Sequence, residues 1–170
     1  MHLKGNFWLH FQIDETVLYS SHIQGKHLGF AMSRKQWVFD PNSGGIKIPA
    51  SKKQEITQRI EQFAAENYAG KYSRLEIRFR SQFCYIDAYT KPVVDAGWPP
   101  ADWPETRDEM IERLRNTPVH LCRLRYFGGD EWGFAFYTYS NEKYQLSVFP
   151  DGRFVGKPED AFAISSMYLE

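Results

Sequence analysis

Hydrophobic and polar residues alternate most regularly near the middle of the chain, in residues 74–80 and 83–89. A period of two is typical of strands with one buried face. Ser81-Gln82 lies between the two runs and predicts a two-residue hairpin turn, although this dipeptide is a poor match to the favoured turn pairs. In that register core-type residues face each other: Phe79 and Cys84, Ile77 and Ile86, Leu75 and Ala88.

Three further strands are expected at 119–126, 132–139 and 143–149, joined by short polar or glycine-containing connections. Strands that follow one another through short turns favour an antiparallel meander. The hairpin 74–89 and the meander 119–149 together predict one antiparallel β-sheet.

Helices are predicted at about 51–68, 106–116 and 158–169, because apolar residues recur there with helical spacing. Ser51 is the predicted N-cap of the first helix. About three helices packing on an antiparallel sheet make an α+β fold. We expect a single domain over 1–170, with an irregular, short-strand part at 1–50 that includes a strand at 7–13, followed by helix, hairpin, helix, meander and helix.

Strict alternation divides the meander into two faces. One has the composition of a core: His120, Cys122, Leu124, Ala135, Tyr137, Leu146 and Val148. The other combines arginine with large rings: Arg123, Arg125, Trp132, Phe134, Phe136, Thr138, Ser147 and Phe149. Either another layer covers this second face, or it is an exposed platform for a protein, for a second copy of the chain or for stacked nucleic-acid bases.

A proline-rich loop at 90–105 separates the hairpin from the second helix and carries Trp98 and Trp103. Sixteen residues is long for a connection, and such loops are often functional. The tryptophans either anchor the crossover to the sheet or form a lid over a site.

Composition narrows the classes of function. Lys and Arg total 21, and so do Asp and Glu, which argues against a strongly electrostatic nucleic-acid binder and leaves little self-repulsion to oppose association. Aromatic residues make up 16% of the chain, so the core or a contact surface is rich in rings. No run of about 20 apolar residues is present, so we expect no membrane contact and, by default, a cytoplasmic location.

Two clusters are weak candidates for chemistry. The predicted hairpin register places Glu76 opposite Asp87, and two adjacent carboxylates can act as acid and base. Arg74 and Arg78 flank Glu76, however, which also fits a surface charge network.

The second cluster comprises Cys84, His120 and Cys122, which would share an inner face if their strands are neighbours. Three such side chains could hold a metal or form a Cys–His catalytic pair. Buried cysteines are equally common as small core residues.

No GxGxxG, GxxxxGK[ST], HExxH or GxSxG motif occurs, and we expect no cofactor. The leading hypothesis is a non-enzymatic protein–protein interaction module that uses the aromatic and arginine face, with Trp98 and Trp103 as further binding residues. The alternatives are single-stranded nucleic-acid binding through the same face, and a small enzyme with a site under the tryptophan–proline loop.

Overall fold

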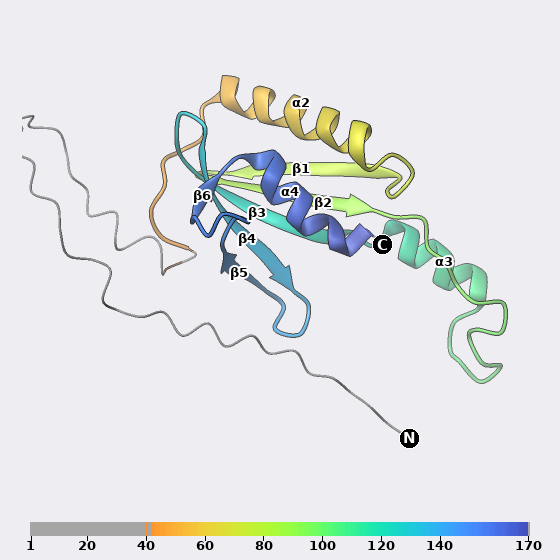
Figure 1. The fold of residues 1–170 in the computed structure, drawn as a ribbon. Coiled ribbons are helices and arrows are strands. Elements are labelled where there is room, and N and C mark those ends of the chain that lie inside the picture. The colour runs from red at the N-terminus through yellow and green to blue at the C-terminus, as the bar shows by residue number, and fades with distance from the viewer. Residues whose placement is uncertain (1–39, 41, 170) are drawn as a thin grey trace, which may run out of the picture. The chain divides into compact units, whose positions relative to one another are not determined.

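The computed structural model describes residue 40 and residues 42–169 (Figure 1). The predicted strand at 7–13 lies outside this part of the chain. The elements, in order, are α2 (Ala50–Asn67), β1 (Arg74–Arg80), β2 (Phe83–Tyr89), α3 (Arg107–Asn116), β3 (Val119–Gly128), β4 (Glu131–Thr138), β5 (Lys143–Ser147), β6 (Val155–Gly156), α4 (Pro158–Ser165) and the 3₁₀ helix η2 (Ser166–Leu169).

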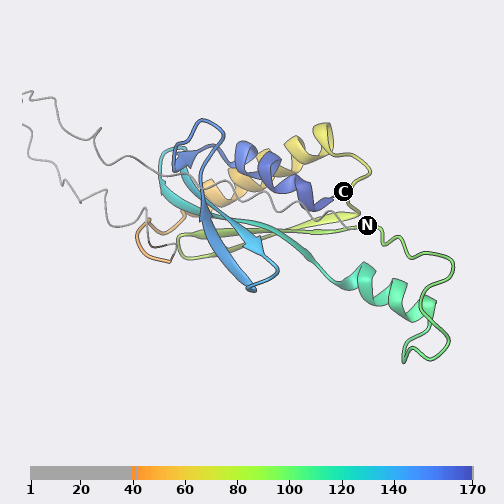
Figure 2. The same cartoon turned by 60° about the horizontal axis from the view of Figure 1, so that its bottom comes forward.

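The strands form one antiparallel sheet in the order β1-β2-β3-β4-β5. The short strand β6 pairs with the first residues of β4, while β5 pairs with the rest of that strand. Helices α2 and α4 lie on the same side of this sheet (Figures 1 and 2). The predicted α+β fold with an antiparallel sheet is confirmed.

The β1–β2 hairpin has the predicted register, with Phe79 opposite Cys84 and Ile77 opposite Ile86. Ser81 adopts a left-handed conformation, with φ 53°. That conformation suits the turn types that match the twist of paired strands. The hairpin therefore keeps strict alternation, and Leu75, Ile77 and Phe79 of β1 all pack against the core.

Strand β3 is less regular, because its pairing shifts at two places. One shift lies opposite Ile86 and Asp87 of β2, where Leu121 is the extra residue; the other lies between Tyr126 and Gly128. Each β-bulge inserts one residue and so changes which side chains share a face. Leu121 and Cys122 both belong to the core as a result.

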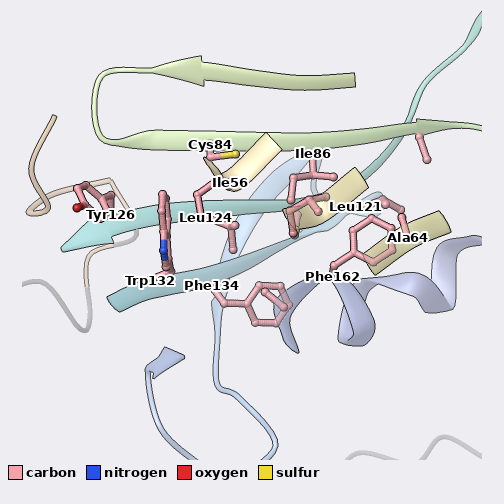
Figure 3. Close-up of a cluster of buried hydrophobic side chains, with 14 of the residues drawn as sticks. Ile56, Ala64, Cys84, Ile86, Leu121, Leu124, Tyr126, Trp132, Phe134 and Phe162 are labelled. Carbon is pink, nitrogen blue, oxygen red and sulfur yellow. The ribbon is translucent and has the colours of Figure 1, made fainter. Parts of the chain in front are cut away.

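The core lies between the sheet and the helices α2 and α4 (Figure 3). Ile56, Ile60 and Ala64 form a fully buried stripe along α2, and Phe162 is the largest buried residue of α4. Burying a large apolar side chain contributes about 1.5–3 kcal/mol. The extended residue that caps α2 is Pro49, so the predicted N-cap, Ser51, lies inside the first turn instead.

An ion-pair cluster ties the two covering helices together on the outside. Arg59 of α2 donates to Glu159 of α4 through Nε at 2.6 Å, and to Asp130 in the β3–β4 turn through a terminal nitrogen at 2.6 Å. One guanidinium thus fixes α2 against both the final helix and the meander.

The chain between β2 and β3 extends beyond the end of the sheet (Figure 2). We call residues 90–116 the arm: a loop followed by α3. Thr106 caps α3 through a capping box with Glu109, and Met110 is the buried residue of the helix. Among the described residues, no helix is long and apolar enough to cross a membrane.

Candidate functional site

The aromatic and arginine face predicted for the meander does not exist as one surface. Arg123 pairs with Ala135 and Arg125 with Gly133, so both arginines lie on the side of the sheet away from α2 and α4. Trp132 and Phe134 point to the helix side and are fully buried (Figure 3). The face assignment was wrong because the bulge between Tyr126 and Gly128 shifts the register by one residue, which exchanges the faces.

Phe136 follows the same pattern, since it pairs with Cys122 and packs against the core. The two arginines are themselves buried, with 7% of Arg123 and 3% of Arg125 exposed. Arg123 donates to the side-chain oxygen of Asn42 at 3.1 Å, and Arg125 donates to the backbone oxygen of Asp40 at 2.5 Å. Their contacts hold Asp40, Asn42 and Ser43 against the helix-free face.

The predicted cluster of Cys84, His120 and Cys122 is also wrong. The bulge at Leu121 places His120 on the helix-free face, whereas both cysteines are fully buried in the core. Figure 3 shows Cys84 there. Burial raises the pKa of Cys122 to about 12, so it is a protonated thiol at neutral pH. No group of potential metal ligands occurs among the described residues.

The predicted pairing of Glu76 with Asp87 is confirmed. Asp87, however, is buried and so does not belong to a network of surface charges. Asp87 is 1% exposed. Its carboxylate accepts from a terminal nitrogen of Arg78 and lies 2.7 Å from Nδ1 of His120. Because a carboxylate only accepts, Nδ1 carries the proton and Nε2 is left available for another partner. Glu76 accepts from the Tyr89 hydroxyl at 2.9 Å.

Tyrosine rings surround this buried carboxylate. Tyr137 packs on His120 with ring centroids 4.7 Å apart, and on Tyr144 at 5.2 Å. Tyr85 packs on Tyr144 at 5.6 Å, and the Tyr139 hydroxyl accepts from the His120 backbone at 2.8 Å. We call the set Arg78, Tyr85, Asp87, His120, Tyr137 and Tyr144 the Asp87 cluster.

The hydroxyl of Tyr144 is buried and has no hydrogen-bond partner in the described structure. Burial, and then the negative charge of Asp87, raises the pKa of Tyr144 well above its usual range. A buried polar group without a partner costs about 1–3 kcal/mol. Tyr144 is therefore a phenol with unused hydrogen-bonding capacity beside an ion-paired carboxylate.

The tryptophan–proline loop carries two neighbouring tryptophans that are partly exposed. Trp98 and Trp103 pack on each other, with ring centroids 5.6 Å apart, and remain 45% and 48% exposed. They line a shallow cavity of about 310 Å³ that is formed by the loop and the start of α3. Glu76, Asp87, His120 and Cys122 do not line it, so the enzyme site predicted under this loop is not assembled there.

Comparison with protein-family models, with curated proteins and with solved structures finds no match.

The sequence reasoning missed the tyrosines of the Asp87 cluster. One signal could have found Tyr85: in the correctly predicted hairpin register it lies opposite Arg78, on the same face as Asp87. Tyr137 and Tyr144 join the cluster through the register of three further strands, β3, β4 and β5. Local alternation of polar and apolar residues does not determine that register.

Proposed function

We propose that the protein is a non-enzymatic interaction module that binds a protein partner through the arm. The proposal rests on one observation: two adjacent tryptophans, each nearly half exposed, lie on a segment that projects beyond the sheet (Figure 2). Tryptophan is enriched among the residues that dominate binding energy at protein interfaces.

The arm has internal contacts that would hold the tryptophans ready for binding. Arg107 donates to the backbone oxygen of Val94 at 2.7 Å, and Arg113 forms two hydrogen bonds to Glu105 at 2.8 and 2.9 Å. A preorganised loop loses less conformational freedom on binding than a mobile one does.

A second copy of the chain is the partner that we propose first. The chain has equal numbers of basic and acidic residues, so long-range repulsion between copies is small. Two identical arms can pair around a two-fold axis and cover each other's tryptophans, which is the common geometry of homodimers.

Sedimentation velocity over a range of protein concentrations tests this proposal. The wild-type chain is expected to form a dimer as its concentration rises, and a variant with Trp98→Ala and Trp103→Ala is expected to remain monomeric. Met167→Ala is the matched control, because Met167 is 62% exposed but lies outside the arm. A wild-type chain that stays monomeric throughout, or an arm variant that dimerises equally well, contradicts self-association through the arm.

The same experiment addresses the nucleic-acid alternative when a fluorescent single-stranded oligonucleotide is added at low and moderate salt. Binding through phosphates weakens steeply with salt. Co-sedimentation at low salt that is lost on replacing Arg78 and Arg80 by alanine would favour nucleic acid instead. Both arginines lie on β1 with exposed side chains facing the helix-free side.

A further inference from the structure

The Asp87 cluster has more hydrogen-bond donors than acceptors. Both oxygens of Asp87 are engaged, one by Arg78 and the other by His120. Arg78 is 51% exposed, and its Nε lies 3.6 Å from Glu76, so its guanidinium retains N–H groups for a ligand. Tyr144 adds a hydroxyl without a partner. What the cluster lacks is an acceptor.

The position of Tyr144 indicates where that acceptor would lie. Its ring packs against Tyr85 and Tyr137, and Tyr137 in turn packs on His120. The charges of Asp87 and Arg78 both act on its hydroxyl. Tyr144 therefore belongs to the same network of rings as His120, and its hydroxyl is buried there, close enough to Asp87 and Arg78 for their charges to act on it.

We propose that the Asp87 cluster binds a small oxyanion, with Arg78, His120 and Tyr144 as its contacts and Asp87 as the residue that orients the first two. Arginine recognises phosphate and carboxylate groups through parallel N–H bonds. A carboxylate behind an imidazole fixes its tautomer and its ring orientation. Asp87 is thus a positioning residue and does not contact the anion.

Phosphate fits this set of groups better than a carboxylate does. A hydrogen phosphate has acceptor oxygens for Arg78 and Tyr144, and it also has an O–H, so it can pair with Nε2 of His120 whether that nitrogen donates or accepts. An ionised carboxylate has acceptors only. Phosphate and acetate therefore probe the same site but differ in how they pair with the imidazole.

A structural role for the same residues is the competing explanation. Arg78 and His120 could serve only to neutralise a buried carboxylate, as ion pairs commonly do. That explanation assigns no role to the Tyr144 hydroxyl, which has no hydrogen-bond partner in the described structure. Tyr144→Phe therefore separates the two, because it removes only this hydroxyl.

The test is an NMR titration of the full chain with sodium phosphate and, separately, with sodium acetate, at constant pH and at ionic strength matched with sodium chloride. The expected result is a saturable shift of the His120 ring signals with a dissociation constant on the order of 1 mM for phosphate, and weaker binding of acetate. Tyr144→Phe should weaken phosphate binding about tenfold, since hydrogen bonds to charged groups are among the strong ones.

Tyr72→Phe is the matched control, because Tyr72 is half-buried against the core away from the cluster, and it should bind phosphate like the wild type. Shifts that do not saturate or that chloride reproduces would overturn the proposal, as would equal binding by Tyr144→Phe. Saturation by acetate alone would make the ligand a carboxylate. The proposal is independent of the arm, since the arm variant should bind phosphate normally.

Discussion

Two aromatic regions of the molecule differ in what their rings contact. The tyrosines of the Asp87 cluster lie on a sheet and pack around an ion-paired carboxylate that is almost completely buried. The tryptophans of the arm pack on each other beyond the end of the sheet and are nearly half exposed. The first arrangement suits a small polar ligand, which needs fixed donors. The second suits a macromolecule, which can cover apolar area.

The difference also shows that aromatic content alone does not identify a binding surface. The largest rings of the meander, Trp132 and Phe134, are core residues, whereas the polar-tipped tyrosines lie on the helix-free face. Four variants or conditions test the contrast between a cluster that contributes to folding and an arm that does not.

Removing the central carboxylate should have the largest effect. Asp87→Ala deletes two charge-assisted hydrogen bonds and leaves Arg78 and His120 without their acceptor. We expect a loss of about 2–3 kcal/mol in the free energy of unfolding. The loss is not larger because Arg78 is half exposed and can form hydrogen bonds to water in the variant. Urea denaturation measures it. Asp151→Ala, which breaks an exposed pair with Arg153, is the control and should cost much less, because exposed ion pairs contribute little to stability. Equal losses in the two variants would mean that the Asp87 cluster is only a surface network.

Alkaline pH should give the next largest effect. Burial raises the pKa of Tyr144, so the folded state keeps a proton that the unfolded state releases above about pH 10. Stability from this group is fully present below that pH and falls by about 1.4 kcal/mol per pH unit above it. Wild type and Tyr144→Phe, unfolded in urea at pH 10 and 11, should differ by this slope. Parallel slopes would show that the phenol is not held in its neutral form.

The hairpin and strand β3 show how much of this arrangement the sequence could predict. In the hairpin each residue has one partner across a regular ladder, so the period of two correctly placed Glu76 opposite Asp87. Strand β3 contains two bulges, and neither leaves a local signal, since Leu121-Cys122 and Tyr126-Phe127 look like ordinary strand residues. Each bulge exchanges the faces, which is why His120 was assigned to the core face and Phe134 to the opposite face.

The arm shows a second limit on what the sequence could predict. Its prolines and glycine predicted an irregular loop, and residues 90–106 contain neither helix nor regular strand. Whether Trp98 and Trp103 touch the sheet depends on the direction in which the chain leaves β2, which no local pattern encodes. Long-range packing decides that direction, so the sequence left both roles of the tryptophans open.

Replacing both arm tryptophans should change stability little. Each ring is nearly half exposed, and its principal ring contact is the other one. We therefore expect Trp98→Ala with Trp103→Ala to cost about 1 kcal/mol or less, well below the 3–5 kcal/mol typical of a buried aromatic. Thermal and urea unfolding check this, with Phe162→Ala as the buried comparison. A loss as large as that of Phe162→Ala would make the arm part of the folding core and weaken its assignment as a binding segment.

The smallest expected change in the free energy of unfolding comes from removing a single tyrosine hydroxyl. It distinguishes a hydroxyl without a hydrogen-bond partner from one that donates a hydrogen bond. At pH 7, Tyr144→Phe removes a buried group without a partner and should raise the free energy of unfolding by about 0.5 kcal/mol. Tyr89→Phe is the contrasting variant, because that hydroxyl donates to Glu76 at 2.9 Å, and it should lower the free energy of unfolding. The two substitutions delete the same atom from tyrosines on different strands, β2 and β5, so opposite signs would tie the difference to hydrogen bonding. If Tyr144→Phe destabilises as Tyr89→Phe does, the Tyr144 hydroxyl already has a partner in the free protein, and its availability to an oxyanion is lost as an argument.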